Sequence, residues 1–282
     1  MSYKVGLVLE GGGMRGVFTA GVVDALLDYG VSFPYVIGTS SGASCGCVYL
    51  ARQRGRIRFI DIDLQSQRPY VGLSPVIHGK GVIDLDFVFN DVQKSYYPFD
   101  FDTFRRSGSR FVMVSTSAVT GEAVYTEEYD DFGRFVDACR SSCSLPILCP
   151  PWHIEGVPMV DGGVADSIPY DRALADGCEK VVVVSTKDAG YRKSEWRMWL
   201  PKNVYKDFPK LRESLLSRNV RYNGQVVRLE GLEADGTAIV VRPADMHGVT
   251  RTSSDPVKLE ALYAEGLEQG RKLVDRVATL LL

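Results

Sequence analysis

The sequence has few histidines, no long apolar run and no excess of charge of either sign. Only three of its 282 residues are histidine, which leaves few candidates for a histidine relay. No stretch reaches the roughly 18 apolar residues that a membrane-spanning helix needs. The 33 basic and 35 acidic residues give a net charge of −2. This balance argues against a protein that binds nucleic acid by neutralising phosphates.

Cysteine is also sparse, because six cysteines are too few for a disulfide scaffold in a chain of this length. One group has the composition of a zinc site: Cys139, Cys143, Cys149 and His153. It lacks the paired, closely spaced cysteines that structural zinc sites usually present. We expect these side chains to pack as small apolar residues, and we expect neither a metal nor another cofactor.

The short apolar segment at residues 5–9 is followed by Glu10 and three glycines. A secretory signal needs a longer apolar core and a cleavage site of small residues, so we expect a first strand here and a cytoplasmic protein. Peripheral contact with a membrane stays open, because one later segment mixes aromatic and cationic side chains as interfacial anchors do. Its members are Trp196, Arg197, Trp199, Lys202, Tyr205 and Lys206. A solvated helix face with packed aromatics is the alternative that we favour.

Apolar runs alternate with helical patterns along the chain, and 45% of the residues are hydrophobic, as in a soluble globular protein. The alternation predicts a three-layer α/β/α fold with a mostly parallel central sheet. The expected strands are 4–9, 35–38, 110–117, 122–126, 159–160, 180–186 and 238–242. The expected helices are 15–29, 43–52, 206–222 and 256–282.

No internal repeat or low-complexity linker divides the chain. We therefore expect a single domain over residues 1–282, with a core over about 1–190 and a C-terminal extension over about 191–282. The pattern is weak between residues 53 and 102, where aromatic residues are mixed with aspartates. A lid or a wall of the functional site is one interpretation of this stretch, and a surface excursion is the one we favour.

Residues 38–42 form a G-x-S-x-G sequence between an expected strand and an expected helix. Its glycines permit a cramped turn, which lifts the Ser40 hydroxyl clear of the backbone. The N-terminus of the following helix adds free N–H groups and positive potential where an anionic intermediate would form. This context predicts a nucleophilic serine.

A glycine-rich loop, Gly11-Gly12-Gly13-Met14-Arg15-Gly16, also lies between an expected strand and an expected helix. Consecutive glycines let backbone N–H groups turn toward one point and build an anion nest. An oxyanion hole, a nucleotide phosphate loop and a tight structural turn each fit this pattern. Against the nucleotide, no Walker lysine follows, and the acidic ribose partner expected about 20 residues on is missing. The one carboxylate near that distance, Asp28, lies inside the expected helix.

Asp161-Gly162-Gly163 follows the apolar pair at residues 159–160. An aspartate at the end of a strand, followed by two glycines, can face a pocket while the chain turns away. A turn or a helix cap is the alternative, since Asp-Gly often marks one.

Together, the three motifs resemble the patatin-like phospholipase family. Its hallmarks are a G-G-G-x-R/K-G loop, a G-x-S-x-G serine and a D-G-G or D-G-A aspartate, in this order along the chain. A fourth family feature, a small-residue segment that ends in proline, is visible at residues 141–146. The resemblance covers about residues 5–169. Glu10 departs from the aspartate that often precedes the glycines, and we expect the loop to stay intact because its N–H groups supply the binding.

The resemblance implies a serine–aspartate dyad. Ser40 would attack an ester carbonyl, and Asp161 would take its proton directly as general base. Since a carboxylate is a weak base near pH 7, a desolvated pocket should raise the pKa of Asp161. The oxyanion hole would be formed by the loop and the residue after the nucleophile: Gly11, Gly12, Gly13, Arg15 and Ser41. Arg15 would orient the loop or contact a lipid phosphate.

The rival arrangement is a Ser-His-Asp triad with His247, because Ser40, Asp161 and His247 follow the chain order of α/β-hydrolases. However, Ser40 follows only the second expected strand, whereas such hydrolases place several strands before the serine. The setting of His247 also fits a solvated loop histidine.

The sequence therefore predicts a serine hydrolase of lipid esters, such as a phospholipase A or a lysophospholipase. Its partner would be a lipid or acyl-ester substrate and not a nucleic acid, and the oligomeric state is not indicated. Two other classes stay open. One is a lipid-binding protein that kept the fold without turnover, and the other is a nucleotide-binding protein that uses the glycine loop.

Overall fold

The computed structural model describes residues 3–194, 200–278 and 280. Trp196, Arg197 and Trp199, three members of the expected interfacial segment, lie outside the described residues. None of the described helices is both long and apolar enough to pass through a bilayer.

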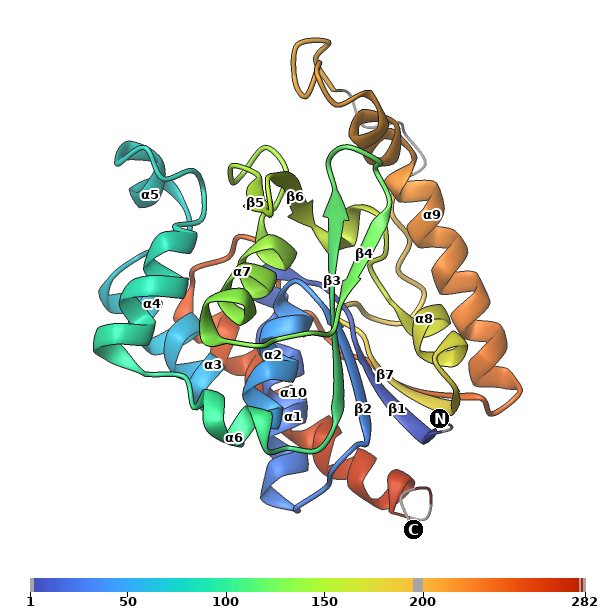
Figure 1. Ribbon diagram of the computed structural model, residues 1–282. Coiled ribbons are helices and arrows are strands. Elements are labelled where there is room, and N and C mark those ends of the chain that lie inside the picture. The colour runs from blue at the N-terminus through green and yellow to red at the C-terminus, as the bar shows by residue number, and fades with distance from the viewer. Residues whose placement is uncertain (1–2, 195–199, 279, 281–282) are drawn as a thin grey trace.

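An eight-stranded, mostly parallel sheet forms the centre of the molecule (Figure 1). Its order is β5-β6-β3-β2-β1-β7-β8, and β4 pairs with β3. β3, β2, β1, β7 and β8 pair with one another in parallel, whereas the β3–β4, β3–β6 and β5–β6 pairs are antiparallel. The strands are β1 Tyr3–Leu9, β2 Tyr35–Thr39, β3 Arg110–Ser117, β4 Ala123–Thr126, β5 Trp152–Ile154, β6 Val157–Asp161, β7 Cys178–Val184 and β8 Ala238–Val241.

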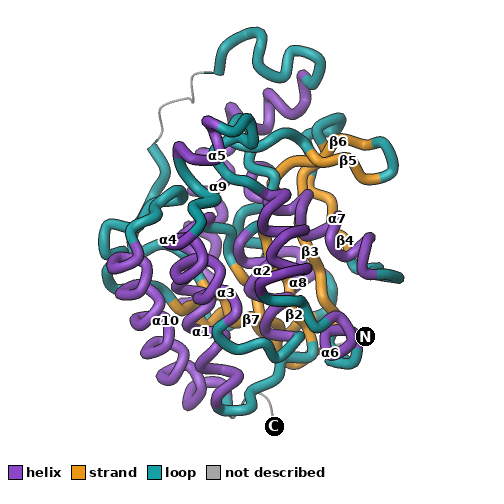
Figure 2. The backbone as a smooth tube through the Cα atoms, turned by 90° about the vertical axis from the view of Figure 1, so that its left-hand side faces the viewer, coloured by secondary structure: helices purple, strands orange, loops and turns teal. Residues whose placement is uncertain are grey.

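Helices cover both faces of the sheet, which confirms the predicted α/β/α layers. Alternate residues of β1 point to opposite faces, as the pleat requires: Leu7 and Leu9 belong to one buried cluster and Val8 to another. The first cluster includes residues of α1, α2, α7 and α10, which lie in front of the strands in Figure 2. The second includes Tyr170 of α8 and Tyr222 of α9.

The α-helices differ widely in length, from single turns to a helix of 26 residues. They are α1 Gly16–Asp28, α2 Ser41–Leu50, α3 Arg56–Arg58, α4 Gln65–Gln67, α5 Leu73–Ile77, α6 Phe101–Arg105, α7 Phe132–Cys143, α8 Tyr170–Ala175, α9 Pro209–Ala234 and α10 Pro256–Val277. Short 3₁₀ turns span Gly13–Arg15 and Gly162–Val164, and π-helical segments span Phe59–Leu64 and Phe87–Tyr96.

Every expected strand is present, and β5 is an additional one. The helix prediction is less complete, because α3, α4, α5, α6, α7 and α8 were not expected. α9 begins at Pro209 and continues to Ala234, well past the expected end at residue 222. It continues because Leu229 is buried against the same face of the sheet as Tyr222, so packing stabilises the additional turns.

The C-terminal residues are part of the same layers. β8 pairs in parallel with β7, and α10 packs along α1. The backbones of these two helices approach so closely that a Cβ at Gly266 would collide with the carbonyl of Phe18. Glycine is required at this crossing.

Candidate active site

Ser40 lies in a sharp turn between β2 and α2. Its backbone has φ 56° and ψ −126°, a conformation that costs a non-glycine residue on the order of 1–3 kcal/mol. The side chain is only 5% exposed. The Ser40 N–H donates to Ser142 Oγ at 2.8 Å, and the Ser142 hydroxyl donates to the carbonyl of Val114 at 2.6 Å. The turn is therefore held in place by the C-terminal end of α7 and by β3.

β3 aligns Asp161 with this turn. Its residue Val114 pairs with Thr39 at the end of β2, and the next residue, Ser115, pairs with Asp161 at the end of β6. β4 also pairs with both Val114 and Ser115 and so occupies the other edge of β3. β2 and β6 therefore lie on the same edge of β3, one after the other. The register brings Ser40 and Asp161, 121 positions apart, to one point.

The Asp161 side chain is buried, with 2% exposure. Its Oδ1 accepts a hydrogen bond from the Gly163 N–H at 2.8 Å. Among the described residues, its Oδ2 has no partner of ordinary hydrogen-bond geometry. The Ser40 hydroxyl is nevertheless close enough to stabilise the carboxylate, which is typical of a loose contact that tightens when substrate binds.

Burial raises the pKa of Asp161 above its ordinary value. Hydrogen bonding by Ser40 and the charge of Arg218 oppose this effect without cancelling it. The result is a carboxylate with a greater affinity for a proton than a solvated one, next to a serine hydroxyl.

The small-residue segment at the end of α7 supports both residues. Ser142 binds the backbone of Ser40, and the Ser144 carbonyl accepts the Asp161 N–H at 2.8 Å. Both serine side chains are buried. Sequence reasoning noted this segment only as a family feature and gave it no role. Through these two hydrogen bonds, the segment fixes the backbones of Ser40 and Asp161 relative to each other.

The backbone N–H groups of the glycine loop differ in whether they already have a hydrogen-bond partner. The Gly11 N–H donates to the Ser167 carbonyl at 3.2 Å, and the Gly12 N–H donates to Ser41 Oγ at 2.9 Å. The Gly13 N–H opens a 3₁₀ turn and so has no partner within that turn. Gly13 has φ 58°, and a Cβ there would lie 2.6 Å from the Arg251 carbonyl, so the loop needs glycine at this position. The Ser41 N–H, in the first turn of α2, likewise has no partner within its helix.

Arg15 and Glu10 hold the loop from its two ends. Arg15 Nε donates to the Gly12 carbonyl at 3.2 Å, and burial lowers the pKa of this guanidinium. Glu10 is buried, and both of its carboxylate oxygens accept hydrogen bonds. The donors are the Tyr222 hydroxyl, the Ser185 hydroxyl and the Thr186 N–H. Glu10 thus connects the loop to β7 and α9.

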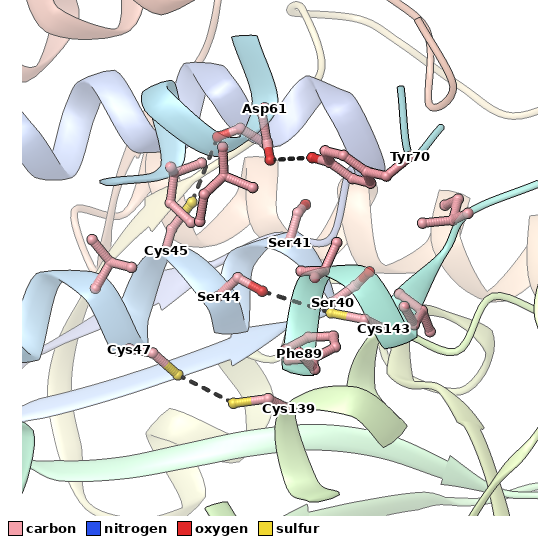
Figure 3. A pocket seen from close by; sticks show the side chains of 18 of the residues that line it. Ser40, Ser41, Ser44, Cys45, Cys47, Asp61, Tyr70, Phe89, Cys139 and Cys143 are labelled. Atoms are coloured by element: carbon pink, nitrogen blue, oxygen red, sulfur yellow. Dashed lines mark hydrogen bonds between the residues drawn. The ribbon is translucent and has the colours of Figure 1, made fainter. Parts of the chain in front are cut away.

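An apolar cavity opens on one side of Ser40 (Figure 3). We use this name for the space lined by α2, α7 and residues of the stretch 56–99. Ser44 and Cys143 lie beside Ser40, whereas Cys47 and Cys139 lie farther along α2 and α7. The stretch contributes Ile57, Ile60, Tyr70, Val71, Leu85, Val88 and Phe89 to the wall. The expectation of a surface excursion between residues 53 and 102 is therefore wrong, because these side chains build the cavity.

A polar cavity opens on the other side of Ser40. It is formed by the glycine loop, Asp161 and residues between positions 187 and 222, together with Arg251. Of its cationic side chains, sequence reasoning named Arg15 and missed the others, including Arg218. A signal for Arg218 was present, since it shares the buried face of α9 with Leu211, Leu215 and Tyr222 at helical spacing. A cationic residue on the buried face of a helix is unusual and indicates a structural or functional role.

The rival site residues lie elsewhere. His247 lines neither cavity, and its Nε2 is 2.9 Å from Glu265 Oε2. The cysteines of the zinc alternative contact separate groups: Cys139 the thiol of Cys47, Cys143 the Ser44 hydroxyl and Cys149 the Ile83 carbonyl. Within the described part of the chain, no three His, Cys, Asp or Glu side chains gather as a metal site would require.

The chain is similar to known proteins over part or nearly all of its length. An uncharacterized protein of Escherichia coli K12, YjjU, is 30% identical over 190 residues, which cover 65% of this chain and 52% of that protein. The lysophospholipase NTE1 of Scheffersomyces stipitis is 25% identical over 288 residues, 95% of this chain but only 18% of NTE1. The chain thus spans about half the length of the first relative and far less of the second.

Comparison of structures gives the same fold. VipD from Legionella pneumophila superimposes with a TM-score of 0.54 over 98% of this chain and 67% of VipD, at 14% identity. Residues 208–282 match a domain of unknown function, DUF6363. Residues 7–174, which contain Ser40, Asp161 and the glycine loop, match the sequence profile of the patatin-like phospholipases. The chain therefore belongs to the patatin-like phospholipase family.

Proposed function

We propose that this chain is a lipid acyl-ester hydrolase that uses Ser40 as nucleophile and Asp161 as general base. The observation that carries the proposal is the position of Ser40, which lines both cavities next to a buried carboxylate. An ester held there would place its acyl chain among apolar side chains and its alcohol among polar ones. The name of the relative NTE1, a lysophospholipase, supports the same substrate class.

In the proposed first step, Ser40 Oγ attacks the ester carbonyl carbon while its proton moves to Asp161 Oδ2. The carbonyl oxygen becomes an oxyanion, which accepts hydrogen bonds from the Gly13 and Ser41 N–H groups. Each such donor is typically worth about 3 kcal/mol in the transition state. In this proposal Gly11, Gly12 and Arg15 shape the loop, because their polar groups already bind protein atoms.

When the intermediate collapses, the bond to the alcohol breaks and the leaving oxygen takes the proton from Asp161. A water molecule then attacks the acyl-enzyme and gives its proton to Asp161. The Ser40–acyl bond breaks, the serine regains a proton, and the fatty acid leaves. The raised pKa of Asp161 favours both proton transfers to the carboxylate.

The test is hydrolysis of p-nitrophenyl butyrate and of an oleoyl ester by purified variants. We expect Ser40→Ala and Asp161→Asn each to lower kcat/KM by about 10³-fold or more. Ser141→Ala is the matched control, because this buried serine donates only to the carbonyl of Ala138 in its own helix. Retained activity in Ser40→Ala, with unchanged thermal unfolding, would refute the proposal.

Two further measurements separate the alternatives. A fluorophosphonate probe should label the wild type and not Ser40→Ala, whereas a lipid-binding protein without turnover would remain unlabelled. His247→Ala should keep its activity, because its imidazole engages Glu265. A loss of activity in this variant would replace the dyad with a triad.

A further inference from the structure

The polar cavity carries a concentration of positive charge that the proposed ester chemistry does not use. Five cationic side chains of the described residues line it: Arg15, Lys187, Lys193, Arg218 and Arg251. The chain as a whole has a net charge of −2. The charge of this cavity is therefore opposite in sign to the net charge of the chain. Cations clustered in one cleft create a local positive potential that attracts anions.

Among the described residues, these cations have no ionic partner. Across residues 3–194, 200–278 and 280, none of the five forms an ion pair with a carboxylate. In the part of the chain that the structure describes, the carboxylates that line the cavity are those of Glu10 and Asp161. Glu10 is fully occupied by its three donors, and Asp161 is the proposed base. The cavity is thus left with excess positive charge.

The cations instead contact neutral groups. Arg218 Nε donates to the Gly163 carbonyl at 2.6 Å, and the Lys193 ammonium lies 3.7 Å from the centre of the Tyr222 ring. Burial, followed by the charge of Arg218, lowers the pKa of Lys193 to about 6. Above that pH the Lys193 amine gives up its proton when no anion is bound, and a bound anion would favour the protonated form again.

We propose that the polar cavity binds the phosphate of an anionic lipid headgroup while the ester lies at Ser40. This inference rests on the proposed function and specifies its substrate class. Arg218 and Lys193 are the central ligands, because guanidinium and ammonium groups are well suited to phosphate oxygens. A choline headgroup fits poorly, since its own cation would enter a positive cavity.

The proposal also gives a role to the C-terminal region. Arg218, Tyr222 and Arg251 lie within residues 208–282, which match the domain of unknown function. Lys187 and Lys193 lie between that region and the family match over residues 7–174. The family region supplies the serine, the aspartate, the loop and Arg15, and the residues after it supply the other four cations of the headgroup wall.

The experiment compares two substrates that differ only in phosphate. The kcat/KM values for 1-oleoyl-lysophosphatidic acid and 1-oleoylglycerol are measured in the same neutral detergent at constant ionic strength. We expect at least a tenfold preference for the phosphate-bearing ester. Lys193→Gln should reduce the preference at least fivefold, and Lys193→Arg should retain it. Lys206→Gln is the matched control, because this exposed lysine lies outside the cavity.

Equal rates on the two esters, unaltered by Lys193→Gln, would overturn the headgroup site and leave the proposed function intact. Calorimetric titration with glycerol 3-phosphate separates the remaining outcomes. If it binds while no ester is hydrolysed, with weaker binding to Lys193→Gln, the anion site stands and the proposed function fails. If it binds while neither ester is preferred, the site belongs to a free phosphate ester, and the headgroup assignment is wrong.

Discussion

The two cavities that meet at Ser40 are built on different principles. The apolar cavity takes its wall from many interchangeable hydrophobic side chains on α2, α7 and the stretch 56–99. The polar cavity depends on a few individual charges, such as Arg218 and Lys193, that come from residues after the family match. An apolar wall tolerates substitution as long as volume is preserved. A charged wall is more sensitive, because replacing one charged side chain removes a contact to the bound anion. Specificity is therefore expected to concentrate on the polar side.

Asp61 is an acidic side chain in the wall of the apolar cavity and gives the largest expected effect. Its carboxyl accepts a hydrogen bond from the Tyr70 hydroxyl at 2.6 Å (Figure 3), and burial raises its pKa to about 6. The unfolded chain loses this proton near its ordinary pKa, so the associated stability is present at low pH and is lost as pH rises to about 6. Asp61→Asn should therefore stabilise the fold relative to wild type at pH 7, by up to about 3 kcal/mol more than at pH 4.

Urea unfolding of both proteins across this range measures the difference. Asp63→Asn is the matched control, because Asp63 forms an ion pair with Arg58 and does not line the cavity. Parallel stability curves for Asp61→Asn and wild type would show that the apolar cavity tolerates a charge after all.

The volume of the apolar cavity should set the acyl chain length. Val88 lines the cavity from the π-helical segment Phe87–Tyr96, so Val88→Phe fills part of it. We expect the ratio of kcat/KM for p-nitrophenyl palmitate to that for the butyrate to fall about 30-fold, within the range that shape exclusion in an apolar pocket supplies. Val220→Phe, on an exposed position of α9, should leave the ratio unchanged. An unaltered ratio in Val88→Phe would place the acyl chain outside this cavity.

The smallest expected effect links the polar cavity to the proposed base. The positive charge of Arg218 lowers the pKa of Asp161, so its removal should raise that pKa. The base works only when deprotonated, hence the acidic limb of kcat/KM should move to higher pH in Arg218→Gln. A neutral ester such as p-nitrophenyl butyrate isolates this effect from headgroup binding. Arg228→Gln, whose partner is Asp171 on the surface, is the control, and a limb that stays in place would disconnect Arg218 from Asp161.

Local pattern sufficed for much of the fold and for the candidate residues. The strands were predictable because buried parallel strands form continuous apolar runs, and the serine turn was predictable because glycines flank it between a strand and a helix. The expectation that Asp161 lies beside Ser40 came from family resemblance. The alignment of both residues on β3 depends on the pairing register of the strands. This register cannot be predicted from a short stretch of sequence. The catalytic roles of both residues remain predictions.

The parts that sequence reasoning missed depend on distant partners. Ser142 acts through the backbone of Ser40, more than 100 positions away. The apolar wall of residues 56–99 consists of short helical pieces whose pattern is too brief to show a period. The length of α9 was underestimated because its second half is stabilised by contact with the sheet and not by its own composition.

The packing of α10 on α1 has a consequence for how the protein is made. β1 lies between β2 and β7, so the centre of the sheet cannot close until the chain has been synthesised through residue 184. The face of α1 that packs on α10 stays uncovered until α10, which begins at residue 256, has been synthesised. Such non-local pairing slows folding and leaves apolar surface exposed to solvent until the pairing is complete. Residues through α10 must therefore leave the ribosome before this packing can form.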